Sequence, residues 1–261
     1  RLEKSDYSDN FVLKGGLFIY SLTEFDSRVT VDIDFLLKSL PNTPEQLRAI
    51  LERIISVDTG NEFITFEIKS VLPISVAKKY AGISASLVAH IKNTRTPFSI
   101  DFGVGDVIVP KQEKRKIPTQ LNDFSSPMIN TYSLETTIAE KIDAILSLME
   151  FSSRMKDYYD IYYLANKFDF DGKILVDALK RTFANREHNF TVEQFEQVMS
   201  FDADDLMQRK WKAFIKKIDA KTDDFSKVIN TIDDFLRFPI ETALNGTNFL
   251  MQWKASSNIW E

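Results

Sequence analysis

The sequence predicts an α+β fold, with a mixed sheet in the first part of the chain and helices in the second. Three observations lead to this prediction. Short apolar runs with strand-like alternation occur before residue 133, helical apolar stripes dominate after it, and a short polar loop at residues 124–128 separates the two patterns. We therefore expect an α/β domain over residues 1–124 and an all-helical domain over residues 125–261.

The predicted elements of the first domain alternate between strands and helices. Phe11–Leu13 is a short apolar strand that ends at the Gly15-Gly16 turn, and Leu17–Leu22 follows as a short helix. Val29–Leu37 alternates β-branched or apolar residues with acids, which is typical of a strand. The remaining elements are a helix that begins at Thr43-Pro44 and strands at Phe63–Leu72, Ile83–Ile91 and Phe98–Phe102.

The second domain is predicted to be a series of helices. Ser133 is expected to cap the first one, whose apolar residues recur at helical spacing as far as Met149. Pro239 is expected to end the last one, because proline removes a helical hydrogen bond, and a tryptophan-containing tail follows. The further helices are predicted at Arg154–Asn166, Gly172–Phe183, Val192–Met199, Asp204–Ile218 and Asp223–Phe238.

The composition indicates a globular protein with a packed core. The chain has 261 residues, of which 44% are hydrophobic and 27% are charged, as is ordinary for such proteins. It has no cysteine, which excludes disulfides and cysteine-based metal sites and fits the reducing cytosol. Its longest apolar runs, such as Leu17–Leu22 and Val104–Val109, are too short to cross a bilayer. We therefore expect a cytoplasmic protein.

The strongest chemical signal is the segment Asp32-Ile-Asp34. Residues two apart on a strand point to the same face, so the two carboxylates would lie side by side. Such a pair repels itself unless a cation binds between the two groups. Carboxylate ligands favour Mg²⁺, which also recruits substrate phosphates. The motif alone is weak, because exposed strands often carry it.

Two neighbouring segments strengthen the interpretation as a metal site. Gly15 and Gly16 form either a simple tight turn or a place where backbone N–H groups approach a phosphate closely. Asp101 lies in an apolar strand, where an isolated acid is costly unless it is functional or solvated. Two acids on one strand and a third on a neighbouring strand are what metal-dependent nucleotidyl transfer requires.

Two helical segments carry further charged candidates. Lys141 sits among apolar residues and is either a surface lysine with a buried stem or a phosphate ligand. Asp157 and Asp160 share a helix face. They fit either an ion-pair lattice with Arg154 and Lys156 or a catalytic pair.

Two basic clusters are candidates for binding nucleic acid, although a solvated surface is the simpler interpretation of each one taken alone. The net charge of −5 argues against a protein coated in nucleic acid, but an enzyme needs only a local basic patch. The clusters are Lys111, Lys114, Arg115 and Lys116 in a predicted loop, and Arg209, Lys210, Lys212, Lys216 and Lys217 on a predicted helix.

The chain carries five motifs in a fixed order: Phe11-Val-Leu-Lys14-Gly15-Gly16-Leu, Arg28-x-Thr-x-Asp32-Ile-Asp34-Phe, Ser99-Ile-Asp101-Phe-Gly-x-Gly-Asp106, Glu140-Lys141-Ile-x-Ala and Arg154-x-Lys156-Asp157-x-Tyr-Asp160. Each motif alone is unspecific. Their content and order resemble the AbiEii/MenT-type nucleotidyltransferase toxins, over Phe11 to about Leu164. The resemblance implies a polymerase-β-like nucleotidyltransferase core with a mixed sheet, followed by a helical domain that contributes Lys and Asp side chains to the active site.

The resemblance also implies a role for each candidate residue. Many related enzymes have Gly-Ser where this chain has Gly15-Gly16, so backbone N–H groups must contact the phosphate without a serine hydroxyl. The implied NTP-binding residues are Lys14, Gly15, Gly16, Arg28 and Lys141; the implied Mg²⁺ ligands are Asp32, Asp34 and Asp101; and the implied catalytic residues are Asp32, Asp34, Lys141, Asp157 and Asp160.

The function that the resemblance implies is Mg²⁺-dependent transfer of a nucleoside monophosphate from an NTP to RNA, with the acceptor end of tRNA as the expected target. The protein would be the toxin of a bacterial toxin–antitoxin (phage abortive infection) system, neutralised by an antitoxin with a winged-helix DNA-binding part. One alternative acceptor is a small molecule such as an aminoglycoside, or a protein side chain. Another alternative is a non-catalytic binding partner with the same fold. A basic rim around the site would favour RNA, and a closed acidic pocket would favour an aminoglycoside.

Overall fold

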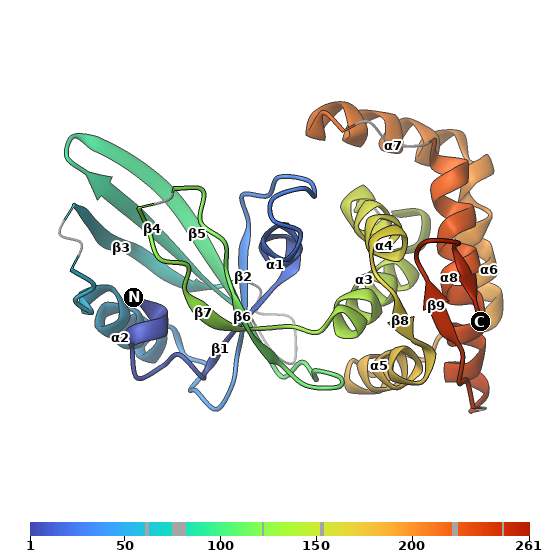
Figure 1. The fold of residues 1–261 in the computed structure, drawn as a ribbon, viewed down its shortest axis with the longest axis horizontal. Coiled ribbons are helices and arrows are strands. Elements are labelled where there is room, and N and C mark those ends of the chain that lie inside the picture. Colours follow the sequence, from blue (N-terminus) through green and yellow to red (C-terminus); the bar gives the residue numbers. More distant parts are fainter. Residues whose placement is uncertain (61–62, 75–81, 122, 152–153, 221–223, 247) are drawn as a thin grey trace. The chain divides into compact units, whose positions relative to one another are not determined.

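The structure is a computed structural model that describes residues 1–60, 63–74, 82–121, 123–151, 154–220, 224–246 and 248–261. Over these residues the chain forms two compact units. The first, Arg1–Asp106 with Gln112–Tyr132, contains a mixed sheet, and the second, Val107–Lys111 with Ser133–Glu261, is mainly helical (Figure 1). The predicted α+β fold class is therefore confirmed.

A seven-stranded mixed sheet in the order β3-β4-β5-β2-β1-β7-β6 forms the first unit. β2 runs parallel to β5 and β1 runs parallel to β7, whereas the other neighbouring pairs are antiparallel. The strands are β1 (Phe11–Lys14), β2 (Ile33–Leu37), β3 (Ile64–Pro73), β4 (Ile83–Ile91), β5 (Thr94–Val104), β6 (Glu113–Lys116) and β7 (Met128–Thr131). Helix α1 (Gly15–Leu22) follows β1, and α2 (Pro44–Ser56), capped by Thr43 as predicted, packs against β3.

Three phenylalanine rings stabilise the centre of this sheet. Phe35 and Phe102 are register partners on β2 and β5, with ring centroids 6.4 Å apart. Phe11 of β1 packs edge-on against both at 5.8 Å, a geometry that aromatic quadrupoles favour. Because side chains alternate along a strand, Asp34 and Asp101 project from the opposite face of the sheet. The apolar packing thereby fixes where these two acids lie.

Strand β2 begins at Ile33, not at Val29, so the predicted placement of Asp32 and Asp34 on one strand is wrong. The pairing with β5 starts at Ile33, and the pairing with β1 ends where Asp34 meets Lys14. The chain turns into α1 directly after Lys14, so β1 offers no partner for Asp32, and the pairing of β2 with β5 does not extend beyond Ile33. The backbone N–H of Asp32 instead donates to the Thr30 hydroxyl at 3.3 Å.

The edge of the sheet beyond β1 also differs from the prediction. Residues Glu113–Lys116 form β6 and pair with β7, where the sequence predicts a basic loop. The residues of β6 are all charged, so they lack the apolar alternation by which a strand is predicted from sequence. Lysine and arginine are nevertheless common on edge strands. Strand β5 starts at Thr94, earlier than predicted, because it forms a tight hairpin with β4.

The second unit contains the predicted helices and a small additional sheet. The helices are α3 (Leu134–Leu148), α4 (Met155–Lys167), α5 (Gly172–Asn185), α6 (Val192–Met199), α7 (Asp205–Ile218) and α8 (Phe225–Asn245); the strands are β8 (Phe170–Asp171), β9 (Gln252–Lys254) and β10 (Ile259–Trp260). Asp223, the predicted start of the last helix, lies outside the described residues. None of the described helices combines the length and apolar character needed to cross a membrane.

Helix α8 continues through Pro239 to Asn245, so the predicted stop at Pro239 is wrong. Proline has no N–H to donate to the carbonyl four residues earlier, that of Phe235. The indole N–H of Trp260 donates to this carbonyl at 3.1 Å instead. The C-terminal strand therefore satisfies the group that proline leaves without its helical donor.

The packing of the C-terminal segment on α5 depends on the absence of a side chain at Gly172. A Cβ at this position would lie 2.5 Å from the Phe249 ring and 2.6 Å from the Met251 carbonyl oxygen. We expect Gly172→Ala to lower the free energy of unfolding by about 1–3 kcal/mol, as overpacking does. Urea unfolding measures the effect, and the adjacent exposed substitution Lys173→Ala should leave the midpoint unchanged. Equal midpoints for the two variants would show that the contact is not tight.

Candidate active site

Three strands of the first unit align charged side chains in one row. Lys14 is the register partner of Asp34 across β1 and β2, and Asp34 is the partner of Asp101 across β2 and β5. Partners of this kind project from the same face, on strands about 4.8 Å apart. All three residues are half-buried. The sheet thus places two carboxylates next to each other, with a lysine beside them.

Two glycines bring the start of α1 against this row. Gly15 has a positive φ of 68°, and a Cβ there would lie 2.3 Å from Asp34 Oδ2. A Cβ on Gly16 would lie 2.9 Å from the Thr30 hydroxyl oxygen. Only glycine allows the backbone to approach these side chains so closely.

The N-terminus of α1 is suited to bind an anion. Its N-cap residue, Lys14, makes no capping hydrogen bond through its side chain with the described residues. Six other helices are capped by a Ser, Thr or Asp side chain. A Cβ on Gly16 would lie 3.3 Å from Arg28 Nη2, so a guanidinium lies beside the first N–H groups of α1. Helix N–H groups and a neighbouring cation together favour a phosphate here.

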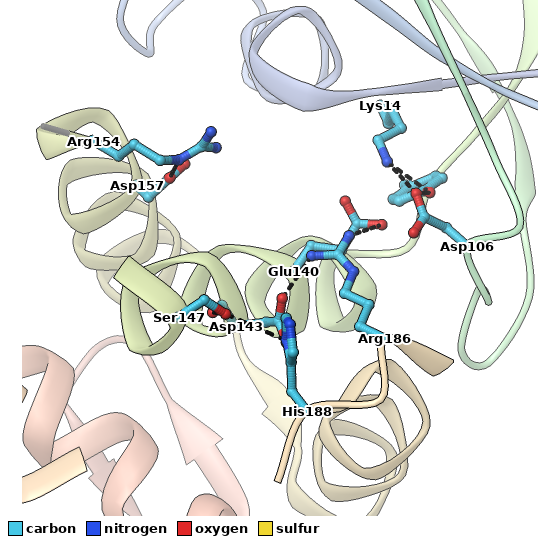
Figure 2. Close-up of polar contacts among 10 residues, drawn as sticks. Lys14, Asp106, Glu140, Asp143, Ser147, Arg154, Asp157, Arg186 and His188 are labelled. Carbon is cyan, nitrogen blue, oxygen red and sulfur yellow. Dashed lines mark hydrogen bonds and ion pairs between the residues drawn. The ribbon is translucent and has the colours of Figure 1, made fainter. Parts of the chain in front are cut away.

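Asp106 forms an ion pair of 2.7 Å with Lys14, and Figure 2 shows the two side chains pointing toward each other. The Lys14 ammonium also donates to the Tyr132 hydroxyl at 3.1 Å and lies 4.9 Å from the centre of that ring. The sequence motif contains Asp106 but indicates no role for it. The pair spans 92 residues, so only the Gly103-x-Gly105-Asp106 pattern after β5 could have drawn attention to it. Asp106 and Tyr132 position the lysine of the charged row.

The three predicted metal ligands are not gathered into one group. Asp32 is exposed and precedes β2. Within the described ranges, no three His, Cys, Asp or Glu side chains come close enough together to hold a metal ion. Asp34 and Asp101 remain as an aligned pair. Mg²⁺ commonly uses one or two carboxylates and takes its other ligands from substrate phosphates and waters. The pair therefore fits Mg²⁺ as part of a nucleotide complex.

In the second unit, Lys141 of α3 meets Asp157 and Asp160 of α4. Its ammonium lies 3.0 Å from Asp157 Oδ1 and 2.7 Å from Asp160 Oδ2. Lys141 is 8% exposed, and the two acids are 0% and 1% exposed. The interpretation of Lys141 as a surface lysine is therefore wrong, because the ammonium lies inside the unit. The structure brings together the three residues that the sequence singled out in this half of the chain.

Arg154 completes the charge balance of this cluster. It is the N-cap residue of α4, which also lacks a side-chain cap from the described residues, and it pairs with Asp157 (Figure 2). Burial alone would raise the pKa of Asp157, but the charges of Lys141 and Arg154 and their hydrogen bonds outweigh burial and lower it. The stabilisation is present above the pKa of an unfolded aspartate, about 4, and is lost as the pH falls through the lower folded pKa.

A second group of charged side chains, centred on Asp143, connects α3 to the residues that follow α5. The buried Asp143 carboxylate binds Arg186 at 2.8 Å and His188 at 2.8 Å, and Arg186 also pairs with Glu140 at 3.3 Å (Figure 2). These contacts tie α3 to the end of α5. The sequence offers no role for His188, and the structure shows it as a partner of Asp143.

The chain is similar to a known protein family and to solved structures. Residues 1–237 match the family described as nucleotidyl transferase AbiEii toxin of type IV toxin–antitoxin systems. The structure is similar to that of JHP933 from Helicobacter pylori, with 15% identity, 94% of this chain and 86% of that chain covered, and a TM-score of 0.51. A candidate nucleotidyltransferase from H. pylori gives 12% identity, coverage of 94% and 89%, and a TM-score of 0.46. A comparison with curated proteins gives no match.

The likeness to JHP933 shows a shared fold, and the family match covers most of the chain. The matched range includes the aligned row with Asp34 and Asp101, the start of α1, and the Lys141 cluster. The chain belongs to the AbiEii family of nucleotidyltransferase toxins of type IV toxin–antitoxin systems.

Proposed function

We propose that this protein transfers a nucleoside monophosphate from an NTP to an RNA hydroxyl, with Mg²⁺ as cofactor and the acceptor end of tRNA as the target. The observation that carries the proposal is the register of Lys14, Asp34 and Asp101 directly beside the N-terminus of α1. Carboxylates and phosphate-binding N–H groups are needed together in metal-dependent nucleotidyl transfer. The triphosphate is assigned to Gly15, Gly16 and Arg28, with Lys14 as a further cation.

The chemistry is assigned to groups of the first unit as follows. Asp34 and Asp101 would hold Mg²⁺, which stabilises negative charge on the triphosphate when bound. The N–H groups of Gly15 and Gly16 hold phosphate oxygens in a fixed orientation. The acceptor hydroxyl oxygen forms a bond to the α-phosphorus and releases its proton to water, while the bond to pyrophosphate breaks and pyrophosphate leaves. Asp32, directly before β2, is retained as a candidate ligand.

We assign Lys141, Asp157 and Asp160 to the same reaction, as the family resemblance implies. Several charges buried in one cluster lower stability unless they are well paired, so such clusters are often kept for function. Lys141 is proposed to contact phosphate, and an acid of the pair to complete the active site. The ion pairs with Asp157 and Asp160 set the position of the ammonium.

RNA is proposed as the acceptor in preference to an aminoglycoside because the family resemblance implies it. A cavity of about 440 Å³ in the first unit is lined by α1 together with Arg115, Lys116 and Glu24. Neither Asp34 nor Asp101 lines this cavity, so its charges do not decide between the two acceptors. In the cell the protein is proposed to act in phage abortive infection and to be neutralised by an antitoxin with a winged-helix DNA-binding part.

The transfer is tested with NTPs labelled at the α- or γ-phosphate, Mg²⁺ and total RNA. An RNA band should take the α-label and not the γ-label, because the γ-phosphate leaves with pyrophosphate. The same reaction with Asp34→Asn should fall to background, at least about 10³-fold, since the carboxylate pair is broken. Asp32→Asn should reduce transfer less, because this exposed side chain lies outside the aligned row.

Asp123→Asn is the matched control for these variants, because Asp123 is an exposed aspartate of the same unit. It should retain full transfer, and all three variants should melt cooperatively. Label from the γ-phosphate in RNA, or α-label only in protein, would refute the proposed reaction. An active Asp34→Asn variant would refute the assigned site.

The role of Lys141 is tested with two substitutions, one that keeps its positive charge and one that removes it. Lys141→Arg retains the positive charge between Asp157 and Asp160, so its free energy of unfolding should change by less than about 1.5 kcal/mol. Its transfer rate should fall about 10²-fold, because a planar guanidinium replaces a compact ammonium. Lys141→Met should lose about 3–5 kcal/mol of stability, because it leaves buried acids without this partner. Full transfer by Lys141→Arg would restrict Lys141 to a structural role.

A further inference from the structure

The outward face of α7 carries cations that the proposed active site does not use. On the opposite face, Trp211 and Phe214 pack their rings against Phe225 at 5.3 Å and Tyr159 at 6.0 Å. With about 100° of rotation per residue, positions 209, 212 and 216 lie on the side away from this contact. Arg209, Lys212 and Lys216 are all exposed. Helix α7 (labelled in Figure 1) thus has an apolar side and, by its residue spacing and exposure, a cationic side.

Among the described residues, no acid forms an ion pair with the exposed cations of this face. Arg209, Lys212, Lys216 and Lys217 make no ion pair with any residue in the part of the chain that the structure describes. Other helices pair a surface arginine with an acid four residues away: Arg48 with Glu52, Arg181 with Asp177 and Arg237 with Asp233. Helix α7 carries five cations, Arg209, Lys210, Lys212, Lys216 and Lys217, and one acid, Asp205.

The spacing of the exposed cations fits a row of phosphates. Arg209, Lys212 and Lys216 are three and four residues apart, which places them over about 10 Å of helix axis. One strand of a nucleic-acid duplex carries about three phosphates over that length. A membrane surface would also attract the cations, but binding as an amphipathic helix needs an apolar face, and that face is packed against α4 and α8.

We propose that the outward face of α7 binds the phosphate backbone of the RNA acceptor. This inference rests on the proposed function only for the identity of the partner, because binding does not require transfer. Contacts of this kind carry no sequence information, but they fix the position of the RNA on the protein. Concentrated positive charge in a chain with a net charge of −5 also directs the RNA to this face as it approaches.

The test measures binding of fluorescently labelled bulk tRNA by anisotropy over a series of KCl concentrations, with Asp34→Asn in every sample so that no transfer occurs. The triple variant R209E/K212E/K216E should bind roughly tenfold or more weakly. The slope of log affinity against log salt should fall by about 2, since each lost phosphate contact removes about 0.7–0.9. Circular dichroism checks that both triple variants are folded.

The matched control is K167E/K173E/R181E, which reverses three exposed charges of α4 and α5 in the same unit. It should keep the salt slope and lose little affinity. Equal losses in the two triple variants would overturn the proposal, because only net charge would then matter. Binding of polyglutamate is measured in parallel. If the α7 variant keeps tRNA binding but loses polyglutamate binding, the proposal is overturned and the face is assigned to an acidic protein. If tRNA binding depends on α7 but the protein without substitutions transfers no nucleotide to RNA, only the proposed reaction is contradicted.

Discussion

The register of three strands in the first unit determines where all of its proposed chemistry lies. Lys14, Asp34 and Asp101 are partners across β1, β2 and β5, so a shift of one residue in any strand would turn a charged side chain to the other face. The phenylalanine rings on the opposite face oppose such a shift, because they would lose their packing. The packing of the phenylalanine rings on one face of the sheet thus fixes the register of the charged residues on the other face.

The close approach of α1 depends on that register. Gly15 contacts the Asp34 carboxylate so tightly that a Cβ would lie 2.3 Å from it, and Asp106 holds the lysine that precedes the helix. In the second unit, the buried Lys141 is instead paired with two buried aspartates, Asp157 and Asp160. Both units leave a helix N-terminus without a side-chain cap among the described residues, α1 in one and α4 in the other. Both of these helices carry proposed site residues.

Local signals in the sequence predicted much of the fold and part of the site. The helices of the second unit could be predicted because each has an apolar stripe and most begin at a Ser, Thr or Asp cap. The placement of Asp32 could not be predicted, because it depends on where β1 ends and α1 begins, beside β2. The continuation of α8 through Pro239 depends on Trp260, which is distant in sequence. The contact of Lys14 with Asp106 likewise requires the folded sheet.

We propose that Asp34 and Asp101, beside the start of α1, form the metal and nucleotide site of this nucleotidyltransferase. The most direct measurement is the anomalous diffraction of Mn²⁺, as a substitute for Mg²⁺, in crystals grown with a non-hydrolysable NTP analogue. We expect a manganese peak within ligand distance of the Asp34 and Asp101 carboxylates, about 2.0–2.3 Å, with the triphosphate on the N–H groups of Gly15 and Gly16. A peak at other residues, or a triphosphate bound away from α1, would contradict it.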